Sequence, residues 1–165
     1  ILNRIGLKTI TNNLGSFTRG SKRDIIEINN DFLKKLKFLP LICYEIIYSG
    51  NLKKNTNFDF IINISEDGWF GESIGPKQHF AHSIYRAIET GKYILRSSNN
   101  GMAAIINPLG EIEKYIEFGN SGFIDFEEKR VFNKTIFSTH GNKIFMILIL
   151  LYIFLIFSFN RIRNE

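Results

Sequence analysis

The clearest indication of the fold is the string Phe38-Leu39-Pro40-Leu41-Ile42-Cys43-Tyr44-Glu45. The run is apolar almost throughout, which predicts a buried strand over Phe38–Tyr44. Buried strands of α/β proteins present functional side chains at their carboxyl ends, so the thiol of Cys43 is expected at the rim of a sheet. Glu45 lies close in sequence, but its negative charge opposes thiolate formation. A cation or a proton acceptor must therefore come from another part of the fold.

Short apolar or alternating segments and one helix make up most of the remaining chain, which predicts an α/β layered domain. The expected strands are Asp24–Ile28, Phe58–Ile64, Lys92–Ser97, Ala103–Asn107, Glu111–Tyr115 and, at the end, Gly122–Asp125. Apolar residues at helical spacing predict a helix over Gln78–Thr90, and Gly91 is placed to end it. A turn at residues 108–110 is expected to join two strands. Residues 1–24 lack a clear period and are expected to form a loop.

A membrane helix is predicted near the C-terminus. The run Ile144–Phe159 contains only two polar side chains and is bounded by Lys143 and by Arg161 and Arg163. As a helix it covers about 24 Å, against about 30 Å for the hydrocarbon core, so the flanking basic side chains would extend to the membrane surface. A buried helix of a soluble domain would show a polar stripe, which this run lacks. The two arginines predict a cytoplasmic C-terminus, with the main body on the opposite side.

Composition limits the classes of partner and cofactor. The net charge is +5, but Lys and Arg are scattered along the chain, which is typical of a solvated surface and not of nucleic-acid binding. A membrane surface with anionic lipid suits this charge better. The single cysteine excludes an intrachain disulfide and a multi-cysteine metal site, so no metal or cofactor is expected. His79 and His82 are expected to be polar residues on a helix surface, because only Glu72 and Glu89 lie near them as further ligands.

A second string follows the expected strand Phe58–Ile64. It reads Asn63-Ile64-Ser65-Glu66-Asp67-Gly68-Trp69-Phe70-Gly71. A loop at the end of a buried strand often forms a pocket wall. Trp69, the single tryptophan, either lines such a pocket or closes the core beneath the loop, and the sequence leaves both open. Trp69, Phe70 and Gly71 are accordingly candidates for substrate contacts.

Four groups of residues, in this order, resemble the apolipoprotein N-acyltransferase family. They are Pro40-Leu41-Ile42-Cys43-Tyr44-Glu45, then Asp67-Gly68-Trp69-Phe70-Gly71 with Ser73-Ile74-Gly75-Pro76 and Gln78-His79, then Arg86-Ala87-Ile88-Glu89, and last Leu95-Arg96-Ser97-Ser98-Asn99-Asn100-Gly101. The resemblance covers roughly residues 17–110, and the apolar run falls where that family has its last membrane helix. Two departures lie at the second group, because the family usually has Asn-Asp-Ala-Trp at residues 66–69, where this chain has Glu66 and Gly68.

The resemblance implies a fold and a set of site residues. The family belongs to the nitrilase superfamily, so residues 1–137 are expected to be the C-terminal part of a nitrilase-like αββα sandwich. Residues 138–165 are expected to be one transmembrane helix with a short cytoplasmic tail. The resemblance places the nucleophile at Cys43, an oxyanion donor at the backbone N–H of Tyr44 and a supporting residue at Glu45. The family's catalytic Glu and Lys lie upstream of residue 1, so the chain is expected to be a fragment, inactive without the missing N-terminal portion.

The resemblance also implies a reaction. In that family the cysteine takes an acyl chain from a phospholipid as a thioester and passes it to the N-terminal amine of a diacylglyceryl-apolipoprotein. The expected location is the bacterial inner membrane, with the catalytic part on the periplasmic side.

Three alternatives remain open. One is a nitrilase-like amidase that hydrolyses a C–N bond, which needs no membrane segment. Another is a non-enzymatic, membrane-anchored binding domain in which Cys43 belongs to the core. The third pairs Cys43 with His79, His82 or His140 as in a cysteine protease, although no local motif supports it.

Overall fold

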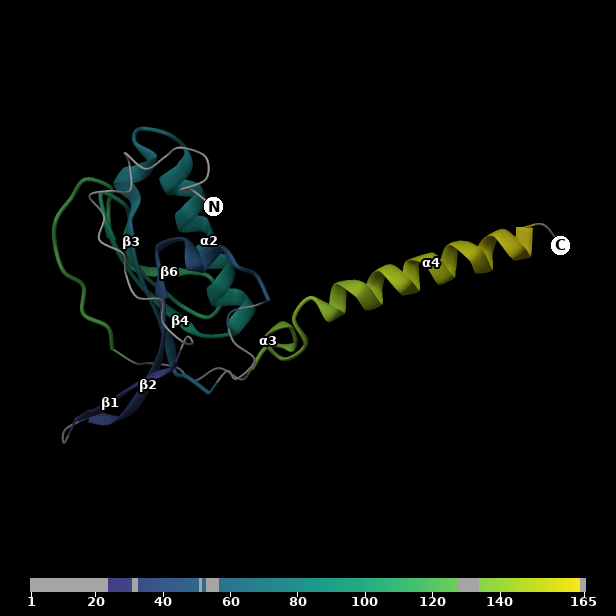
Figure 1. The fold of residues 1–165 in the computed structure, drawn as a ribbon, viewed down its shortest axis with the longest axis horizontal. Helices are drawn as coiled ribbons and strands as arrows, with labels where there is room; N and C mark the ends of the chain where they lie inside the picture. Colours follow the sequence, from purple (N-terminus) through teal and green to yellow (C-terminus); the bar gives the residue numbers. More distant parts are fainter. Residues whose placement is uncertain (1–23, 31–32, 51, 53–56, 128–133, 164–165) are drawn as a thin grey trace, which may run out of the picture.

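The computed structural model describes residues 24–30, 33–50, 52, 57–127 and 134–163. The body contains one six-stranded mixed sheet in the order β1-β2-β3-β4-β5-β6 (Figure 1). The strands are β1 (Ile26–Asn30), β2 (Leu33–Ile42), β3 (Phe60–Glu66), β4 (Tyr93–Asn99), β5 (Ala103–Ile106) and β6 (Ile112–Ile116). The central strands β2, β3 and β4 are parallel, and the other neighbours pair antiparallel. This sheet, with a helix on one face, confirms the predicted α/β class.

Helix α2 (Gly75–Thr90) connects β3 to β4 and covers one face of the sheet (Figure 1). Parallel neighbours need such a crossover connection. Pro76 lies in the first turn, where its missing N–H costs nothing. The helix ends at Gly91, whose φ of 65° is left-handed. The N–H of Gly91 donates to the carbonyl of Ala87 over 2.9 Å, which confirms the predicted stop.

The face of the sheet beneath α2 changes from apolar to polar toward the carboxyl ends of the parallel strands. One row of paired residues across β2, β3 and β4 is Leu39, Ile61 and Ile94, all fully buried. The next row on this face, two residues further along each strand, is Leu41, Asn63 and Arg96. Side chains two residues apart in a strand share a face, so the polar side chains continue the core row directly.

The opposite face carries a second apolar cluster around Phe60, Tyr93 and Ile105. Phe126 packs on this cluster, with its ring centroid 5.8 Å from that of Phe60 and 5.2 Å from that of Tyr93. The predicted strand at Gly122–Asp125 is therefore wrong, because the segment has no regular secondary structure. Ile124 packs over the sheet face, whereas Phe123 is exposed, and the segment adds no strand at the edge.

Strand β2 differs from its predicted bounds at both ends. It begins at Leu33 because its first half pairs antiparallel with β1, where Glu27 lies opposite Lys37. It ends at Ile42, one residue before the thiol, and residues Cys43–Ile47 form the 3₁₀ helix η2. The expected loop over residues 1–24 lies outside the described residues except for Asp24.

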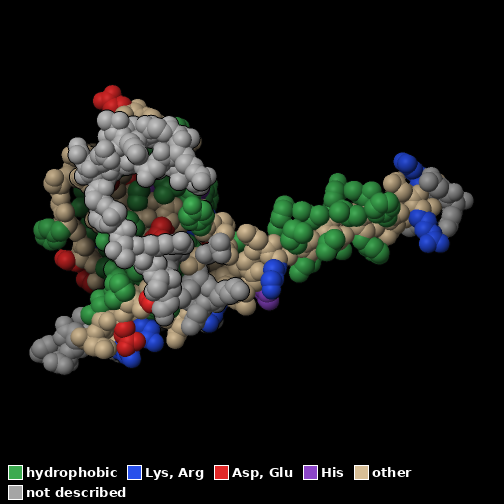
Figure 2. All heavy atoms as spheres, in the orientation of Figure 1, with side chains coloured by type: hydrophobic (Ala, Val, Ile, Leu, Met, Phe, Trp, Pro, Cys, Tyr) green, Lys and Arg blue, Asp and Glu red, His purple; other side chains and the backbone are tan. Residues whose placement is uncertain are grey.

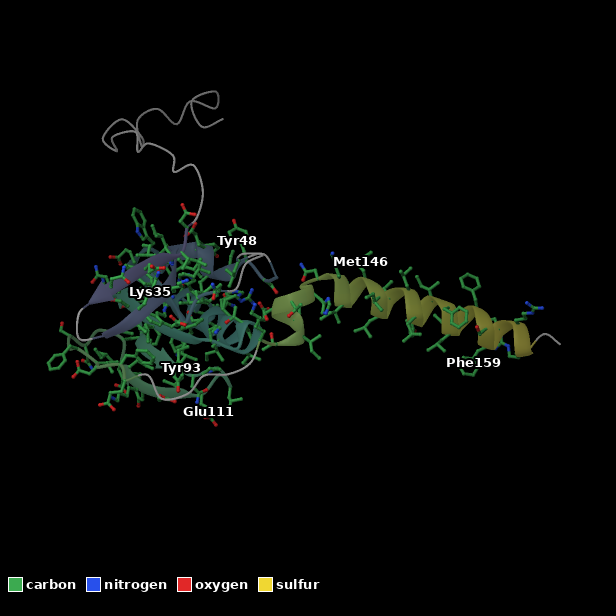
Figure 3. All side chains as sticks on the ribbon, turned by 90° about the horizontal axis from the view of Figure 1, so that it is seen from below. Lys35, Tyr48, Tyr93, Glu111, Met146 and Phe159 are labelled. Carbon is green, nitrogen blue, oxygen red and sulfur yellow. The ribbon has the colours of Figure 1, made fainter. Side chains whose placement is uncertain are left out.

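The C-terminal part is α3 (Ile136–His140) followed by α4 (Lys143–Arg163). Helix α4 projects from the body, and hydrophobic side chains, Met146 and Phe159 among them, lie along it on more than one side (Figures 2 and 3). Its stretch Lys143–Arg161 is long and apolar enough to cross a membrane. The helix includes the whole predicted run Ile144–Phe159.

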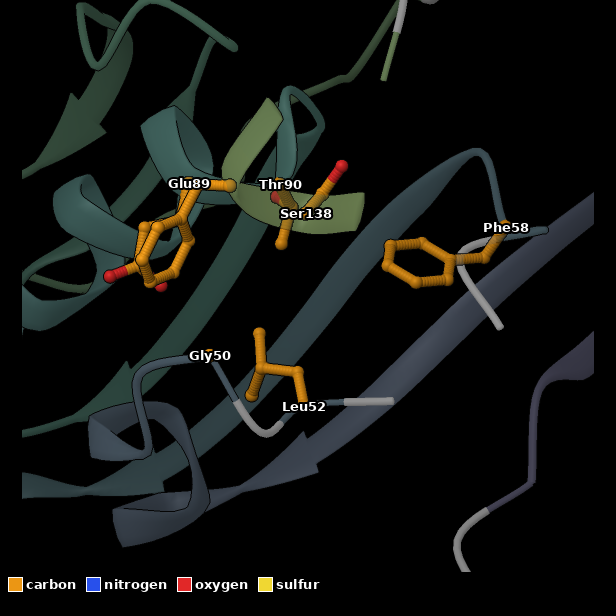
Figure 4. A pocket seen from close by; sticks show the side chains of 7 residues that line it. Gly50, Leu52, Phe58, Glu89, Thr90 and Ser138 are labelled. Atoms are coloured by element: carbon orange, nitrogen blue, oxygen red, sulfur yellow. The ribbon is translucent and has the colours of Figure 1, made fainter. Parts of the chain in front are cut away.

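Helix α3 contacts the end of α2 near the base of α4. The hydroxyl of Thr135 accepts the N–H of Ser138 over 2.9 Å, which caps α3, and donates to the carbonyl of Glu89 in α2. A cavity of about 40 Å³ lies at this junction (Figure 4). It is lined by Gly50, Leu52, Phe58, Glu89, Thr90, Phe137 and Ser138. A space of this size holds only a few waters, so it is not a site for an acyl chain.

Candidate active site

Cys43 occupies a strained backbone position at the end of β2. Its φ is 48°, in the left-handed region that residues other than glycine seldom adopt. Such strain costs about 1–3 kcal/mol and is concentrated at functional sites. The turn is secured on its N-terminal side, because the carboxylate of Glu45 accepts the N–H of Ile42 over 2.8 Å. Glu45 therefore supports the geometry of the turn that presents Cys43.

The thiol of Cys43 lies next to a buried hydroxyl. Ser65 Oγ is 3.7 Å from Cys43 Sγ and 2.8 Å from Asp67 Oδ1. A hydroxyl has one proton to donate, and the shorter contact identifies the carboxylate as its acceptor. Ser65 Oγ can then accept a weak hydrogen bond from the thiol S–H of Cys43. The side chain of Ser65 thus links the thiol to the carboxylate of Asp67.

Asp67 is the centre of a buried polar network. Its carboxylate is fully buried and accepts from Arg96 Nη2 over 2.7 Å and from His79 Nδ1 over 2.8 Å. Burial alone would raise the pKa of Asp67, but the hydrogen bond from His79 and the charge of Arg96 outweigh it, so the pKa lies below its ordinary value. Arg96 also donates to Asn63 Oδ1. The carboxylate is therefore ionised, paired and fixed on three sides.

His79 is buried at the site and is only 2% exposed. The prediction of a surface histidine is wrong. The polar end of the sheet lies beneath this part of α2, so a polar side chain of the helix is buried there with hydrogen-bond partners. The ring stacks against Tyr44, with centroids 5.3 Å apart, and Nε2 lies 3.2 Å from the carbonyl oxygen of Cys43. His79 thus contacts the backbone of Cys43 and not its thiol, which argues against a Cys–His protease pair.

The loop that carries the tryptophan begins with the 3₁₀ helix η3 (Asp67–Phe70). Trp69 is 85% exposed, so the alternative in which it closes the core is wrong. Phe70 packs on Tyr44 and on His79, with centroids 6.2 and 5.5 Å apart, which brings this loop beside the turn that carries Cys43. Gly71 ends η3 with a φ of 56°, where glycine is favoured. Substrate contacts by these residues stay a prediction.

The departure from the family pattern at residues 66–69 has a structural reason. Glu66 Oε1 accepts the N–H of Gly68 over 2.7 Å, and its other oxygen accepts from Asn99. A Cβ added at Gly68 would lie 2.5 Å from Glu66 Oε1. The glutamate carboxylate therefore occupies the space of an alanine methyl, and the two departures compensate each other.

Asn63, Asp67 and Arg96 belong to the site although no sequence motif singles them out as catalytic. The signal that identifies them is the period of two along each strand. Ile61, Asn63 and Ser65 share one face of β3, and Ile94 and Arg96 share the same face of β4. Asp67 follows directly after β3, as the first residue of η3, and is also buried. An apolar strand whose buried face turns polar at its carboxyl end indicates a site, because buried polar groups require partners.

The lowered pKa of Asp67 predicts a loss of stability in acid. A depressed folded-state pKa means that the unfolded chain binds the proton first, so the stabilisation is present above the ordinary pKa of 3.8 and is lost as the pH falls below it. The thermal midpoint in mild detergent, followed by circular dichroism, is expected to fall between about pH 4 and pH 2. Asp67→Asn should show a flatter dependence over this range. An unchanged acid dependence in Asp67→Asn would contradict the attribution of the acid-induced loss of stability to Asp67.

A family model described as carbon-nitrogen hydrolase matches residues 15–132, which is most of the chain. The chain belongs to the carbon-nitrogen hydrolase family. Apolipoprotein N-acyltransferase from Wigglesworthia glossinidia brevipalpis is 43% identical to this family member over 136 residues, 81% of this chain and 25% of the relative. The protein of the same name from Agrobacterium fabrum is 34% identical over 99% of this chain and 31% of its own length.

These comparisons confirm the resemblance to apolipoprotein N-acyltransferases within the carbon-nitrogen hydrolase family. The chain spans about a quarter to a third of the length of these relatives. A solved structure of a superfamily protein from Xanthomonas campestris is 14% identical, with a TM-score of 0.48 over 73% of this chain and 47% of that one.

Proposed function

We propose that this chain is part of an enzyme that transfers an acyl group from a phospholipid to the N-terminal amine of a diacylglyceryl-apolipoprotein. The observation that carries the proposal is the position of Cys43 on a strained turn at the carboxyl end of β2. Cys43 is the single cysteine of the chain, which is 34–43% identical to the two apolipoprotein N-acyltransferases named above. Helix α4, of membrane-spanning length, suits an enzyme whose donor is a lipid. An amidase acting on a small soluble substrate has no use for such a helix.

The proposed reaction has two halves. The thiolate of Cys43 attacks an ester carbonyl of the phospholipid, the C–S bond forms, and the ester C–O bond breaks to release a lysophospholipid that takes a proton. The acceptor amine then attacks the thioester, an amide forms, the C–S bond breaks, and the amine proton leaves through a base. The backbone N–H of Tyr44 would donate to the oxyanion of each tetrahedral intermediate. Glu45 would support the turn, and the family resemblance assigns the base and a lysine to the upstream part of the enzyme.

The proposal extends to location and substrate contacts. The body, residues 1–137, would lie on the periplasmic side of the bacterial inner membrane, and residues 138–165 would anchor it. Arg161 and Arg163 at the end of α4, against Lys143 at its start, support a cytoplasmic C-terminus. Trp69, Phe70 and Gly71 would contact the substrates, because their loop packs beside the nucleophile turn and presents an aromatic ring to solvent.

The test is the intact mass of the protein produced from its complete reading frame and incubated in detergent with phospholipid. An adduct of acyl mass, labile to hydroxylamine and mapped to Cys43, is expected, and Cys43→Ser should form no such thioester. Absence of the adduct on folded protein would favour a membrane-anchored binding domain. Release of ammonia from small amides without any acyl adduct would favour the amidase.

A further inference from the structure

The carbonyl oxygen of Cys43 accepts hydrogen bonds from two buried side chains. His79 Nε2 lies 3.2 Å from this oxygen, and Asn63 Nδ2 lies 3.4 Å from it. We infer that His79 is a positioning residue that aims the Tyr44 N–H at the oxyanion by holding the carbonyl of Cys43. The inference rests on the proposed function, because it concerns the step in which a tetrahedral oxyanion forms.

The planarity of the peptide unit makes this coupling direct. The carbonyl of Cys43 and the N–H of Tyr44 belong to one peptide group, and this peptide is trans. In a trans peptide the C=O and N–H bonds point in opposite directions within one plane. A side chain that fixes the carbonyl therefore fixes the N–H as well. The N–H of Tyr44 must point away from His79 and Asn63, on the other side of the turn.

The strain at Cys43 explains why such a clamp is needed. A residue with φ of 48° relaxes toward the common regions unless its surroundings hold it, and rotation about this residue would swing the following peptide group. The two hydrogen bonds to the carbonyl oppose that rotation. They also polarise the peptide, since hydrogen bonds in a chain strengthen one another, which makes the Tyr44 N–H a better donor.

His79 is itself fixed in orientation. Its Nδ1 lies 2.8 Å from Asp67, and Asp67 is held by Arg96 at 2.7 Å. The rings of Tyr44 and Phe70 pack against the imidazole, with centroids 5.3 and 5.5 Å away. Nε2 faces the carbonyl oxygen of Cys43, which can only accept a hydrogen bond, and Nδ1 faces the carboxylate of Asp67. The Arg96–Asp67 ion pair therefore fixes the ring of His79, and the ring in turn holds the carbonyl of Cys43.

The chain offers a matched pair of substitutions at this position. In His79→Gln the terminal amide nitrogen takes the place of Nε2 and can still donate to the Cys43 carbonyl. In His79→Asn the shorter amide takes the place of Nδ1, so the contact with Asp67 is kept and the carbonyl contact is lost. Both side chains are neutral and polar, and the two variants differ mainly in which of the two hydrogen bonds survives.

Two reactions of Cys43 separate the proposed role from general disruption. Thioester formation from phospholipid builds an oxyanion, whereas alkylation by iodoacetamide is a displacement at saturated carbon and builds none. In the protein from its complete reading frame, His79→Asn is expected to slow thioester formation about 100-fold, the cost of losing one oxyanion donor, and to leave alkylation of Cys43 within about twofold. His79→Gln is expected to retain thioester formation within about tenfold of the parent.

Each other outcome overturns the inference. Equal slowing of acylation and alkylation in His79→Asn would mean that the histidine supports the thiol or the fold. An acylation rate in His79→Asn equal to that of the parent would mean that the carbonyl contact does not matter, as would equal loss in both variants. A parent protein that forms no thioester would reject the proposed function and the inference with it, which distinguishes that failure from a defect confined to the His79 variants.

Discussion

Replacing Asp67 with alanine is expected to lower the free energy of unfolding by about 3–5 kcal/mol, because the guanidinium of Arg96 then remains buried without its countercharge. The Arg96 side chain is fully buried, so water cannot replace the lost partner. The variant also removes the acceptor of His79 and Ser65. The measurement is guanidinium-induced unfolding in mild detergent, followed by far-ultraviolet circular dichroism.

Two controls separate the buried pair from a general effect of losing an aspartate. Asp125→Ala removes an exposed carboxylate and is expected to change the free energy of unfolding by less than about 0.5 kcal/mol. Removing both charges in Asp67→Ala with Arg96→Met should cost less than Asp67→Ala alone, since no unpaired charge remains. A double variant less stable than the single one would show that the charges are not coupled in this way.

Replacing Gly101 with alanine is expected to destabilise the protein by about 3 kcal/mol through overpacking at the same carboxylate. A Cβ at this position would lie 2.2 Å from Asp67 Oδ2 and 2.3 Å from Ser98 Oγ, far inside van der Waals contact. Asp67 cannot move away at low cost, because Arg96, His79 and Ser65 hold it. The free energy of unfolding by denaturant checks the size of the effect.

Gly122→Ala is the matched control for this substitution. Its Cβ would meet only the end of the flexible Ile116 side chain, at 3.3 Å, and its backbone is not left-handed, so a change of less than about 0.5 kcal/mol is expected. In the Asp67→Ala background the cost of Gly101→Ala should shrink, because the clashing carboxylate is gone. Additive costs would show that the clash is relieved by some other movement.

The local elements of this fold could be predicted from sequence to a large extent. The strands β3 to β6 and the helix α2 lie within a few residues of their predicted bounds, because each has a clear period and a turn residue at its end. The end of α2 at Gly91 could be predicted because it requires only a left-handed φ at that residue, which glycine adopts readily. The exceptions depend on packing between segments. Residues 122–125 have no regular secondary structure, and Ile124 packs on a sheet face that the local sequence does not reveal.

The candidate site divides in the same way. Cys43 follows an apolar strand, so its place at the rim of the sheet could be predicted. The burial of His79 could not, since helical periodicity shows which residues share a face but not that a polar end of the sheet lies beneath them. The sequence also leaves open whether Trp69 points into the core or toward solvent, because the orientation of a loop residue depends on its neighbours in space. Here Phe70 packs inward on His79, and Trp69 is exposed.

Residues adjacent in the chain are enough to place Cys43 at a strand end and the apolar run in a helix. The surroundings of the thiol depend instead on contacts between segments that are distant in the sequence. Asn63, Asp67, His79 and Arg96 come from two strands, a 3₁₀ turn and a helix, and they meet because the β3–α2–β4 crossover places α2 over the polar row of the sheet. Their energies depend on the water excluded when these segments pack, and that burial is a property of the assembled fold.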